Sequence, residues 1–422
     1  MKLNYKRTFF IGLAFMSISA FWQLYDNIIP LMLQNTFNIG ETLTGGIMAI
    51  DNVLALFLLP IFGSFSDKVD TRLGKRTPFI IGGTTGAVIF MVLIAYANKT
   101  ANLWLFILSL GLTLVFMGTY RSPAVALMPD LTPKPLRSKA NAVINLMGAV
   151  GAIITLLLIS LIVPERINPD YTNLFIVVAA IMVVSVILLI VTVREKKLSK
   201  TLEIEHESSR EELEEEAKMP KDVKRSLYFL LASIFLWFTA YNAVTTAFSR
   251  YATNVWNMVG GSFANALLVA TGAAIVSYIP IGFISTKFGR KKTIIAGIII
   301  ITSTYFAGFL FKEYSPIINV VFAFTGIGWA SINVNSYPMV VEISGNTNVG
   351  KYTGLYYTFS MAAQIFTPVF SGFLLENVSY RTLFPYAFTF SVLSLVTMLF
   401  VKHGDSKPAQ KESIIDNFDV ED

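Results

Sequence analysis

Long apolar stretches alternate with short polar breaks along most of the chain. A membrane-spanning helix needs about 20 consecutive, largely apolar residues, and by that measure the pattern predicts twelve spans. Gly, Pro, Asn or charged residues mark the breaks between them. The spans are expected near residues 8–34, 42–66, 77–97, 102–128, 139–163, 172–194, 224–250, 261–286, 292–311, 315–341, 351–375 and 382–401. The predicted fold class is an all-α integral membrane protein with twelve transmembrane helices.

Composition supports a chain that lies in a bilayer. Hydrophobic residues make up 54% of it, charged residues only 14%, and the mean hydropathy is +0.61, which is more apolar surface than a soluble core would bury. There is no Cys, and the two His, His206 and His403, lie in polar segments, so we expect no metal site and no cofactor. The net charge of +6 is spread over short loops, which argues against nucleic acid as a partner.

Lys and Arg cluster in the breaks on one side of the predicted spans. Residues 68–76, 134–139 and 287–292 are rich in them, whereas the breaks on the opposite side carry only isolated cations. By the positive-inside bias, we expect both termini in the cytoplasm and the protein in the cell (cytoplasmic) membrane. The first apolar run is too long for a signal peptide and has no clear cleavage site, so we interpret it as a retained span.

One loop sequence occurs twice at matching places. The stretch from Gly63 to Lys68 and the basic run from Arg72 to Pro78 return, in altered form, between Gly282 and Lys292. A duplicated loop in a membrane protein predicts two related halves, and two halves related by an axis along the membrane normal are the architecture of a major facilitator transporter. The predicted parts are a six-helix bundle at residues 1–194, a charged cytoplasmic linker at 195–222, a second six-helix bundle at 223–402 and a polar cytoplasmic tail at 403–422. The linker is either a plain connector or a regulatory element.

Three ionisable residues stand inside predicted spans: Asp26, Asp51 and Arg121. A lone charge in hydrocarbon costs at least about 2.5 kcal/mol on insertion scales, so such residues are rare. Asp26 and Asp51 are candidates for proton coupling, since partial desolvation favours a protonated carboxyl and a nearby guanidinium opposes it. Arg121 is a candidate to pair with a carboxylate or to contact substrate hydroxyls. A structural ion pair that fixes helix contacts is the alternative for each of the three.

Uncharged polar and aromatic residues form a second candidate group within the spans. The candidates for substrate contacts, besides Arg121, are Trp22, Gln23, Tyr25, Asn141, Asn145, Tyr241, Asn242, Asn333, Tyr337 and Gln364. Amides hydrogen-bond to hydroxyls and aromatic rings pack against C–H faces, so the set predicts a neutral, hydroxyl-rich substrate such as a sugar. Interhelical hydrogen bonds and an interfacial aromatic belt are the alternatives for individual members.

Charged residues near the cytoplasmic ends of the spans are candidates for conformational gating. They are Asp67, Arg72, Lys75, Arg76, Asp130, Arg137 and Glu342. Asp67 can accept hydrogen bonds from the N-terminus of a neighbouring helix or pair with Arg and Lys, which would lock one state of a carrier. The alternative for Arg72, Lys75 and Arg76 is that they serve only membrane orientation.

Motifs in the same loops carry a resemblance to a known family. They are Gly63-x-x-Ser66-Asp67, Arg72-x-Gly74-Lys75-Arg76-x-Pro78-Phe79-Ile80, Pro123-x-x-Ala126-Leu127-x-Pro129-Asp130-Leu131, Arg137-x-x-Ala140-Asn141 and Gly350-Lys351-Tyr352-Thr353-Gly354-Leu355. With these motifs, the whole chain resembles the glycoside–pentoside–hexuronide:cation symporters of the major facilitator superfamily. Within that family it is most similar to the sucrose/proton symporter branch.

The resemblance implies import of a sugar or glycoside, such as the disaccharides sucrose or maltose, together with protons. Asp26 falls where sucrose-type relatives carry an acidic residue, which implies a role in proton coupling. Sodium-coupled relatives carry further acidic residues in the second span, whereas residues 52–61 of this chain have none, so the expected coupling ion is H⁺ rather than Na⁺. Thr286 stands where the first half has Asp67, so a lock between the halves is expected to be asymmetric.

Other functions remain open at this point. A proton-coupled exporter of drugs or other small metabolites would share the fold but is expected to have a more apolar cavity. A non-transporting membrane sensor would need an output module, and an enzyme would need a catalytic constellation that the sequence does not offer. We expect a transporter, not an enzyme, that functions as a monomer.

Overall fold

The structure, a computed structural model, describes residues 3–133, 136–166, 169–198, 220–343 and 349–404. Within these ranges, twelve helical segments are long and apolar enough to cross a membrane, which confirms the predicted fold class. The helices are α1 (Tyr5–Asn35), α2 (Glu41–Lys68), α3 (Thr77–Lys99), α4 (Leu103–Asp130), α5 (Arg137–Ile162), α6 (Thr172–Thr192), α8 (Lys221–Trp256), α9 (Ala264–Phe288), α10 (Arg290–Leu310), α11 (Ile318–Ile343), α12 (Val349–Asn377) and α13 (Leu383–Leu399), with a short 3₁₀ helix η2 (Tyr380–Thr382) before α13.

The helix ends follow local sequence. Asn4 and Asn102 accept hydrogen bonds from backbone N–H groups in the first turns of α1 and α4, each at 3.0 Å, as N-cap residues do. The seventh span is longer than predicted, because α8 continues for six residues beyond Arg250. The prediction treated that charge as the end of the span, but Arg250 is buried and paired. The helix ends instead at Asn257, whose left-handed backbone (φ 52°) stops it.

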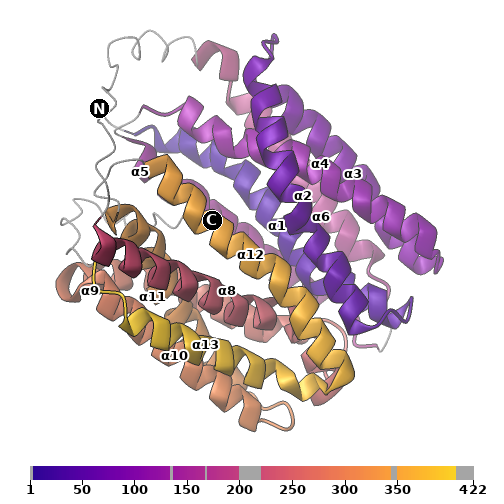
Figure 1. The fold of residues 1–422 in the computed structure, drawn as a ribbon. Coiled ribbons are helices and arrows are strands. Elements are labelled where there is room, and N and C mark those ends of the chain that lie inside the picture. The colour runs from indigo at the N-terminus through magenta and orange to yellow at the C-terminus, as the bar shows by residue number, and fades with distance from the viewer. Residues whose placement is uncertain (1–2, 134–135, 167–168, 199–219, 344–348, 405–422) are drawn as a thin grey trace.

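The helices form two bundles that lie side by side, one from α1 to α6 and one from α8 to α13 (Figure 1). In the first bundle, α1 packs on α5 and α3 packs on α4; in the second, α9 and α10 pack on α11, and α13 packs on α8. The bundles meet through α2 with α12, α5 with α9, and α1 with α8. A site that both halves share must therefore lie along these contacts.

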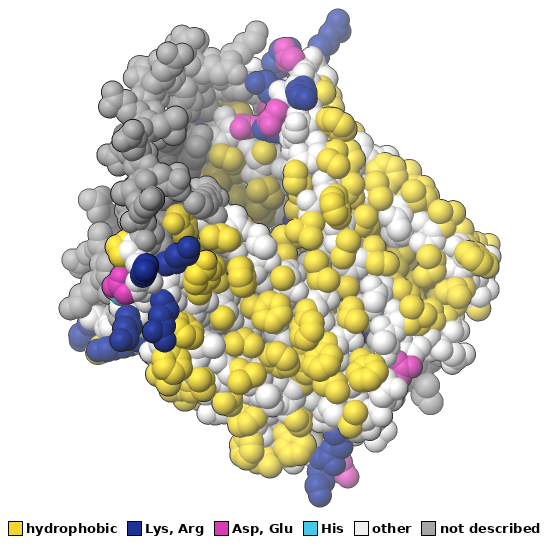
Figure 2. Space-filling view, viewed as in Figure 1, with side chains coloured by type: hydrophobic (Ala, Val, Ile, Leu, Met, Phe, Trp, Pro, Cys, Tyr) yellow, Lys and Arg dark blue, Asp and Glu magenta, His cyan; other side chains and the backbone are white. Residues whose placement is uncertain are grey.

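Apolar side chains cover the outer face of the molecule in view, and charged side chains gather at its two ends (Figure 2). Large hydrophobic residues such as Trp104, Leu161 and Val276 are 87%, 79% and 75% exposed, which suits contact with lipid rather than water. We call the end with loop 69–76 and Gly289 the basic end. The end with loops 36–40 and 257–263 is the distal end.

Small residues allow the closest helix contacts in the first bundle. A Cβ added at Gly83 would lie 2.7 Å from the backbone nitrogen of Tyr120 in α4. A Cβ added at the preceding Gly82 would meet nothing within 4 Å. The two neighbouring glycines of α3 therefore have different roles, although both looked alike in the sequence.

We predict that Gly83→Ala destabilises the protein, because α3 and α4 would have to move apart, at about 1–3 kcal/mol for overpacking. Gly82→Ala is the matched control, and it should leave stability unchanged or raise it slightly, since Ala favours a helix over Gly by about 1 kcal/mol. Thermal unfolding of both purified variants measures the difference. Equal shifts in the two melting temperatures would contradict the assigned packing.

Candidate functional site

A small polar cavity lies between the two bundles. Its volume is about 60 Å³, far below the roughly 300–1,000 Å³ of typical ligand pockets, so this conformation holds the site contracted. The lining residues are Gln23, Asp26, Asn27, Tyr241, Val244, Thr245, Leu267, Ala270, Thr271, Tyr305, Phe322 and Thr325. They come from α1 on one side and from α8, α9, α10 and α11 on the other. Both halves therefore contribute to one site.

Asp26 brings a carboxylate to this cavity from α1. Asn27 orients its neighbour Gln23, since the Asn27 Nδ2 donates to the Gln23 backbone oxygen at 3.0 Å and to its Oε1 at 3.2 Å. Asp51 of α2 lies close enough to act electrostatically on Asp26. The structure thus places the two predicted coupling residues near each other, on adjacent helices of the first half.

Arg121 of α4 belongs to the same group of charges. Its guanidinium carbon lies 5.8 Å from the ring centroid of Trp22, within the range of a cation–π contact. It also acts electrostatically on Asp51. Asp51 accepts a hydrogen bond from Asn52 Nδ2 at 2.7 Å. Asp51 therefore has partners within its own half, whereas Asp26 faces the cavity.

The second half supplies aromatic and hydroxyl groups to the cavity wall. The ring of Tyr241 stacks on Trp329 with 3.7 Å between centroids and 5° between planes. Thr245 and Thr271 each donate to a carbonyl of their own helix, which leaves their oxygens able to accept a hydrogen bond. Tyr305 is buried and lines the cavity.

Two buried polar atoms of the cavity lining, Asn27 Oδ1 and the Tyr305 hydroxyl, have no hydrogen-bond partner within the described residues. The same holds for Trp22 Nε1, Asn145 Nδ2 and Asn242 Nδ2, which belong to predicted substrate contacts outside the lining. Most buried polar groups in proteins are hydrogen-bonded, and an unsatisfied one asks for an explanation. A polar ligand or water in the cavity would satisfy the two lining atoms. Thr271 and Tyr305 were not among the predicted site residues, because a hydroxyl on an apolar helix gives no sequence pattern.

Other predicted substrate contacts lie elsewhere in this conformation. Tyr25 is 1% exposed and its hydroxyl points to the Met48 carbonyl oxygen at 3.4 Å, which is a packing position between α1 and α2. The Tyr337 hydroxyl lies 2.9 Å from Thr353 Oγ1. The half-buried residues Asn141, Asn333 and Gln364 stand on α5, α11 and α12, outside the cavity lining.

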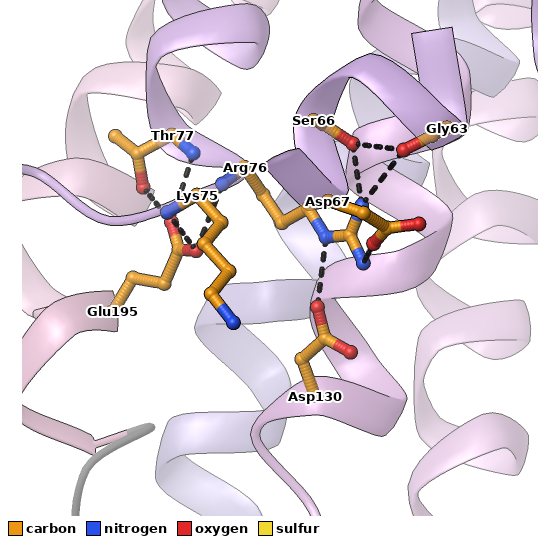
Figure 3. Close-up of polar contacts among 8 residues, drawn as sticks. All are labelled: Gly63, Ser66, Asp67, Lys75, Arg76, Thr77, Asp130 and Glu195. Atoms are coloured by element: carbon orange, nitrogen blue, oxygen red, sulfur yellow. Dashed lines mark hydrogen bonds and ion pairs between the residues drawn. The ribbon is translucent and has the colours of Figure 1, made fainter. Parts of the chain in front are cut away.

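At the basic end, Arg76 is the centre of a charge cluster (Figure 3). Its guanidinium donates to Asp130 Oδ2 at 2.7 Å and to the Gly63 carbonyl oxygen at 3.3 Å, and it also pairs with Asp67 and bonds to Ser66. Three of the predicted gating residues thus meet in one cluster. Since α2, α3 and α4 belong to the same half, the cluster fixes these helices to one another.

The second half has matching contacts at the corresponding positions. In the first half, the Ser66 hydroxyl donates to the Gly63 carbonyl oxygen at 2.8 Å, and in the second half the Ser285 hydroxyl donates to the Gly282 carbonyl oxygen at 3.0 Å. Arg290, at the start of α10, pairs with Glu342 near the end of α11, as Arg76 pairs with Asp130. The repeated contacts support the duplication that the sequence suggests.

The other predicted gating residues are less informative. Arg72 is exposed, and the side chain of Lys75 is exposed while its backbone N–H is bonded. Arg137 begins α5, and its side chain lies outside the described residues. Within the described ranges, no group of three or more His, Asp or Glu residues is placed to hold a metal ion.

Glu195 is a site residue that the sequence did not reveal. The prediction assigned it to the solvated linker, but its side chain is 3% exposed. Glu195 Oε1 accepts from the backbone nitrogens of Lys75 and Arg76 at 2.7 and 2.8 Å, and Oε2 accepts from the Thr77 nitrogen at 2.8 Å and hydroxyl at 2.7 Å (Figure 3). The Glu195 carboxylate is an anion at the N-terminus of α3, where it stabilises that helix. The same contacts anchor the chain that follows α6.

The sequence also gave no sign of an ion pair at the distal end. Arg250 Nε lies 2.8 Å from Glu41 Oε2, and the two side chains are 3% and 2% exposed. The prediction placed both charges at the limits of their spans, where charge is ordinary. Only the folded arrangement shows that they are buried and that they join α2 of one half to α8 of the other.

The arrangement defines a multi-pass membrane protein with a polar cavity between two similar halves. A family model described as Major Facilitator Superfamily matches residues 11–278 and 257–416. Because the match covers most of the chain, the protein belongs to the Major Facilitator Superfamily. Its family and its named relatives are those of transporters rather than of enzymes.

Relatives show more distant similarity. A sucrose transport protein of Arabidopsis thaliana is 26% identical over 152 residues, which are 32% of this chain and 25% of that protein. An uncharacterized symporter of Synechocystis is 25% identical over 177 residues, which are 39% of this chain and 32% of that protein. The matched segments thus cover a third or less of the length of each of these two relatives.

Solved structures show the same fold. The crystal structure of the POT family transporter PepTSo matches with a TM-score of 0.68 and 10% sequence identity, and the match covers 95% of this chain and 98% of that chain. At such low identity, the likeness shows the fold alone.

We predict that Glu195→Gln destabilises the protein by about 1–3 kcal/mol, because an amide nitrogen would face backbone N–H donors that now share a carboxylate. Glu165→Gln is the control, since Glu165 is exposed in a distal loop and loses the same charge. Thermal unfolding of the two variants gives the comparison. A melting temperature for Glu195→Gln that equals that of the control would show that the anchor contributes nothing.

Proposed function

We propose that the protein imports a sugar or glycoside, such as the disaccharides sucrose or maltose, in symport with protons. The observation that carries the proposal is the position of Asp26, a carboxylate in a cavity that both halves build. A group at that position meets substrate and proton in the same space, which symport requires. The similarity of part of the chain to a plant sucrose transport protein supports a sugar as substrate.

The cavity wall suits a hydroxyl-rich ligand. Gln23, Thr245, Thr271 and Tyr305 offer donors and acceptors for hydroxyls, and the stacked pair of Tyr241 and Trp329 offers an aromatic surface. The proposed coupling ion is H⁺, taken up by Asp26 and influenced by Asp51. We also propose that the protein uses no cofactor and that it functions as a monomer.

Orientation follows from charge. The basic end is proposed to face the cytoplasm of the cell membrane by the positive-inside bias, which places both termini there. The halves would rock about the cavity so that each end opens in turn. The contracted cavity requires such a movement before a disaccharide enters.

The test is uptake by purified protein in liposomes, with labelled sucrose and maltose, with and without an inward proton gradient. Wild-type protein should accumulate one of the sugars several-fold when the gradient is present. Asp26→Asn should lose this accumulation and keep sugar exchange, because a permanently neutral side chain binds no proton. Asp170→Asn, at an exposed distal position, is the control and should behave as wild type.

Two results would contradict the proposal. Unchanged accumulation by Asp26→Asn would remove this residue from proton coupling. Absence of uptake across a broad sugar panel, in vesicles shown to hold folded protein, would remove the sugar and favour the proton-coupled exporter.

A further inference from the structure

The buried ion pair at the distal end joins the two halves directly. Arg250 of α8 donates from Nε to Glu41 Oε2 at 2.8 Å and from Nη1 to the Thr246 carbonyl oxygen at 2.7 Å. Both side chains are almost fully buried. Removing one partner of such a pair leaves an uncompensated buried charge, which is strongly unfavourable. Arg250 therefore needs a carboxylate near it in every state in which it stays buried.

Neighbouring contacts between α1 and α2 of the first half and α12 and η2 of the second half surround this pair. We call this contact between the two halves the seam. The backbone nitrogen of Thr42 donates to Glu376 Oε2 at 2.7 Å, and Gln34 Nε2 donates to the Tyr380 hydroxyl at 3.3 Å. At Gly45, an added Cβ would lie 1.9 Å from the Pro368 carbonyl oxygen, so α2 and α12 touch through their backbones. The distal end is closed in this conformation.

Arg250 is part of this seam and lies on the distal side of the cavity. It stands five residues after Thr245, a cavity-lining residue, and six residues before the last residue of α8. A helix rises 1.5 Å per residue, so Arg250 lies about 7.5 Å above Thr245 and about 9 Å below the end of the helix. Arg250 thus lies on the distal side of the cavity, outside its lining.

A second carboxylate, that of Asp26, lies within electrostatic range of Arg250. Besides its bond to Glu41, Arg250 acts electrostatically on Asp26. Glu41 is the first residue of α2, at the distal rim, whereas Asp26 is nine residues before the end of α1, about 14 Å deeper. When halves rock about a point near the middle of the membrane, the rim moves far and the middle moves little. Glu41 would leave Arg250 while Asp26 stays within reach.

We propose that Arg250 exchanges partners in each transport cycle: it binds Glu41 when the distal end is closed and Asp26 when the distal end is open. Arg250 is then a positioning residue that links the distal gate to the proposed coupling carboxylate. The inference rests on the proposed alternation between two open ends, but not on the identity of the substrate.

The test uses a single reporter cysteine, because the chain has no Cys of its own. Thr245→Cys places a thiol in the cavity, and a membrane-impermeant maleimide added from the distal side labels it only when that end opens. We expect Glu41→Gln to raise distal labelling about five-fold or more, since Arg250 loses its partner in the closed state. Glu313→Gln, at an exposed distal position, is the control and should leave labelling unchanged.

Two further variants separate the gate from the partner exchange. The charge exchange Glu41→Arg with Arg250→Glu should restore low labelling, because it rebuilds the pair across the seam. Adding Asp26→Asn to Glu41→Gln should lower labelling at least two-fold, because the open state loses the carboxylate that holds Arg250.

The outcomes are distinct. If Glu41→Gln, shown to be folded, labels like wild type, or if the charge exchange labels like Glu41→Gln, the pair is not the distal lock. If Asp26→Asn changes nothing in the Glu41→Gln background, partner exchange is wrong. Labelling needs neither sugar nor a proton gradient, so a failed uptake experiment and a failed labelling experiment are separate results.

Discussion

A buried ion pair, between Glu41 and Arg250, joins the two halves at the closed distal end. A charge in an apolar interior is tolerated only with a partner, and these two residues belong to different halves of the molecule. Each residue supplies the opposite charge that the other requires when it is buried, so the pair stabilises the state in which the two halves are in contact. Further along the same contact between the halves, α2 and α12 approach each other through their backbones at Gly45.

The charges at the basic end have a different effect. The pairs there each lie within a single half. Arg76 pairs with Asp67 and Asp130 in the first half, and Arg290 pairs with Glu342 in the second. Together with the anchor at Glu195, these pairs hold the helices of each bundle together, and none of the three pairs links one bundle to the other. A carrier that rocks needs this combination of rigid halves and a separable contact between them.

The sequence predicted the fold well because a membrane imposes it. Twelve apolar stretches, each long enough to cross a membrane, predict twelve transmembrane helices. The repeated loop between Gly63 and Pro78 indicated two halves. Within the site, Asp26, Gln23 and Tyr241 could be selected because polar groups are rare in spans. Glu41, Arg250 and Glu195 could not, since a charge at the edge of a span is ordinary and burial depends on tertiary contacts. Tyr305 and Thr271 were missed because single hydroxyls on apolar helices carry no pattern.

The central claim is that two firm halves pivot so that one end opens as the other closes, and that the Glu41–Arg250 pair sets the balance. Spin labels measure this directly, at Arg166→Cys with Glu313→Cys across the distal end and at Leu73→Cys with Lys287→Cys across the basic end. Electron–electron distances in wild type and in Glu41→Gln give the result. The account predicts that Glu41→Gln lengthens the distal distance and shortens the basic one. Distances that stay the same, or that lengthen at both ends, would contradict it.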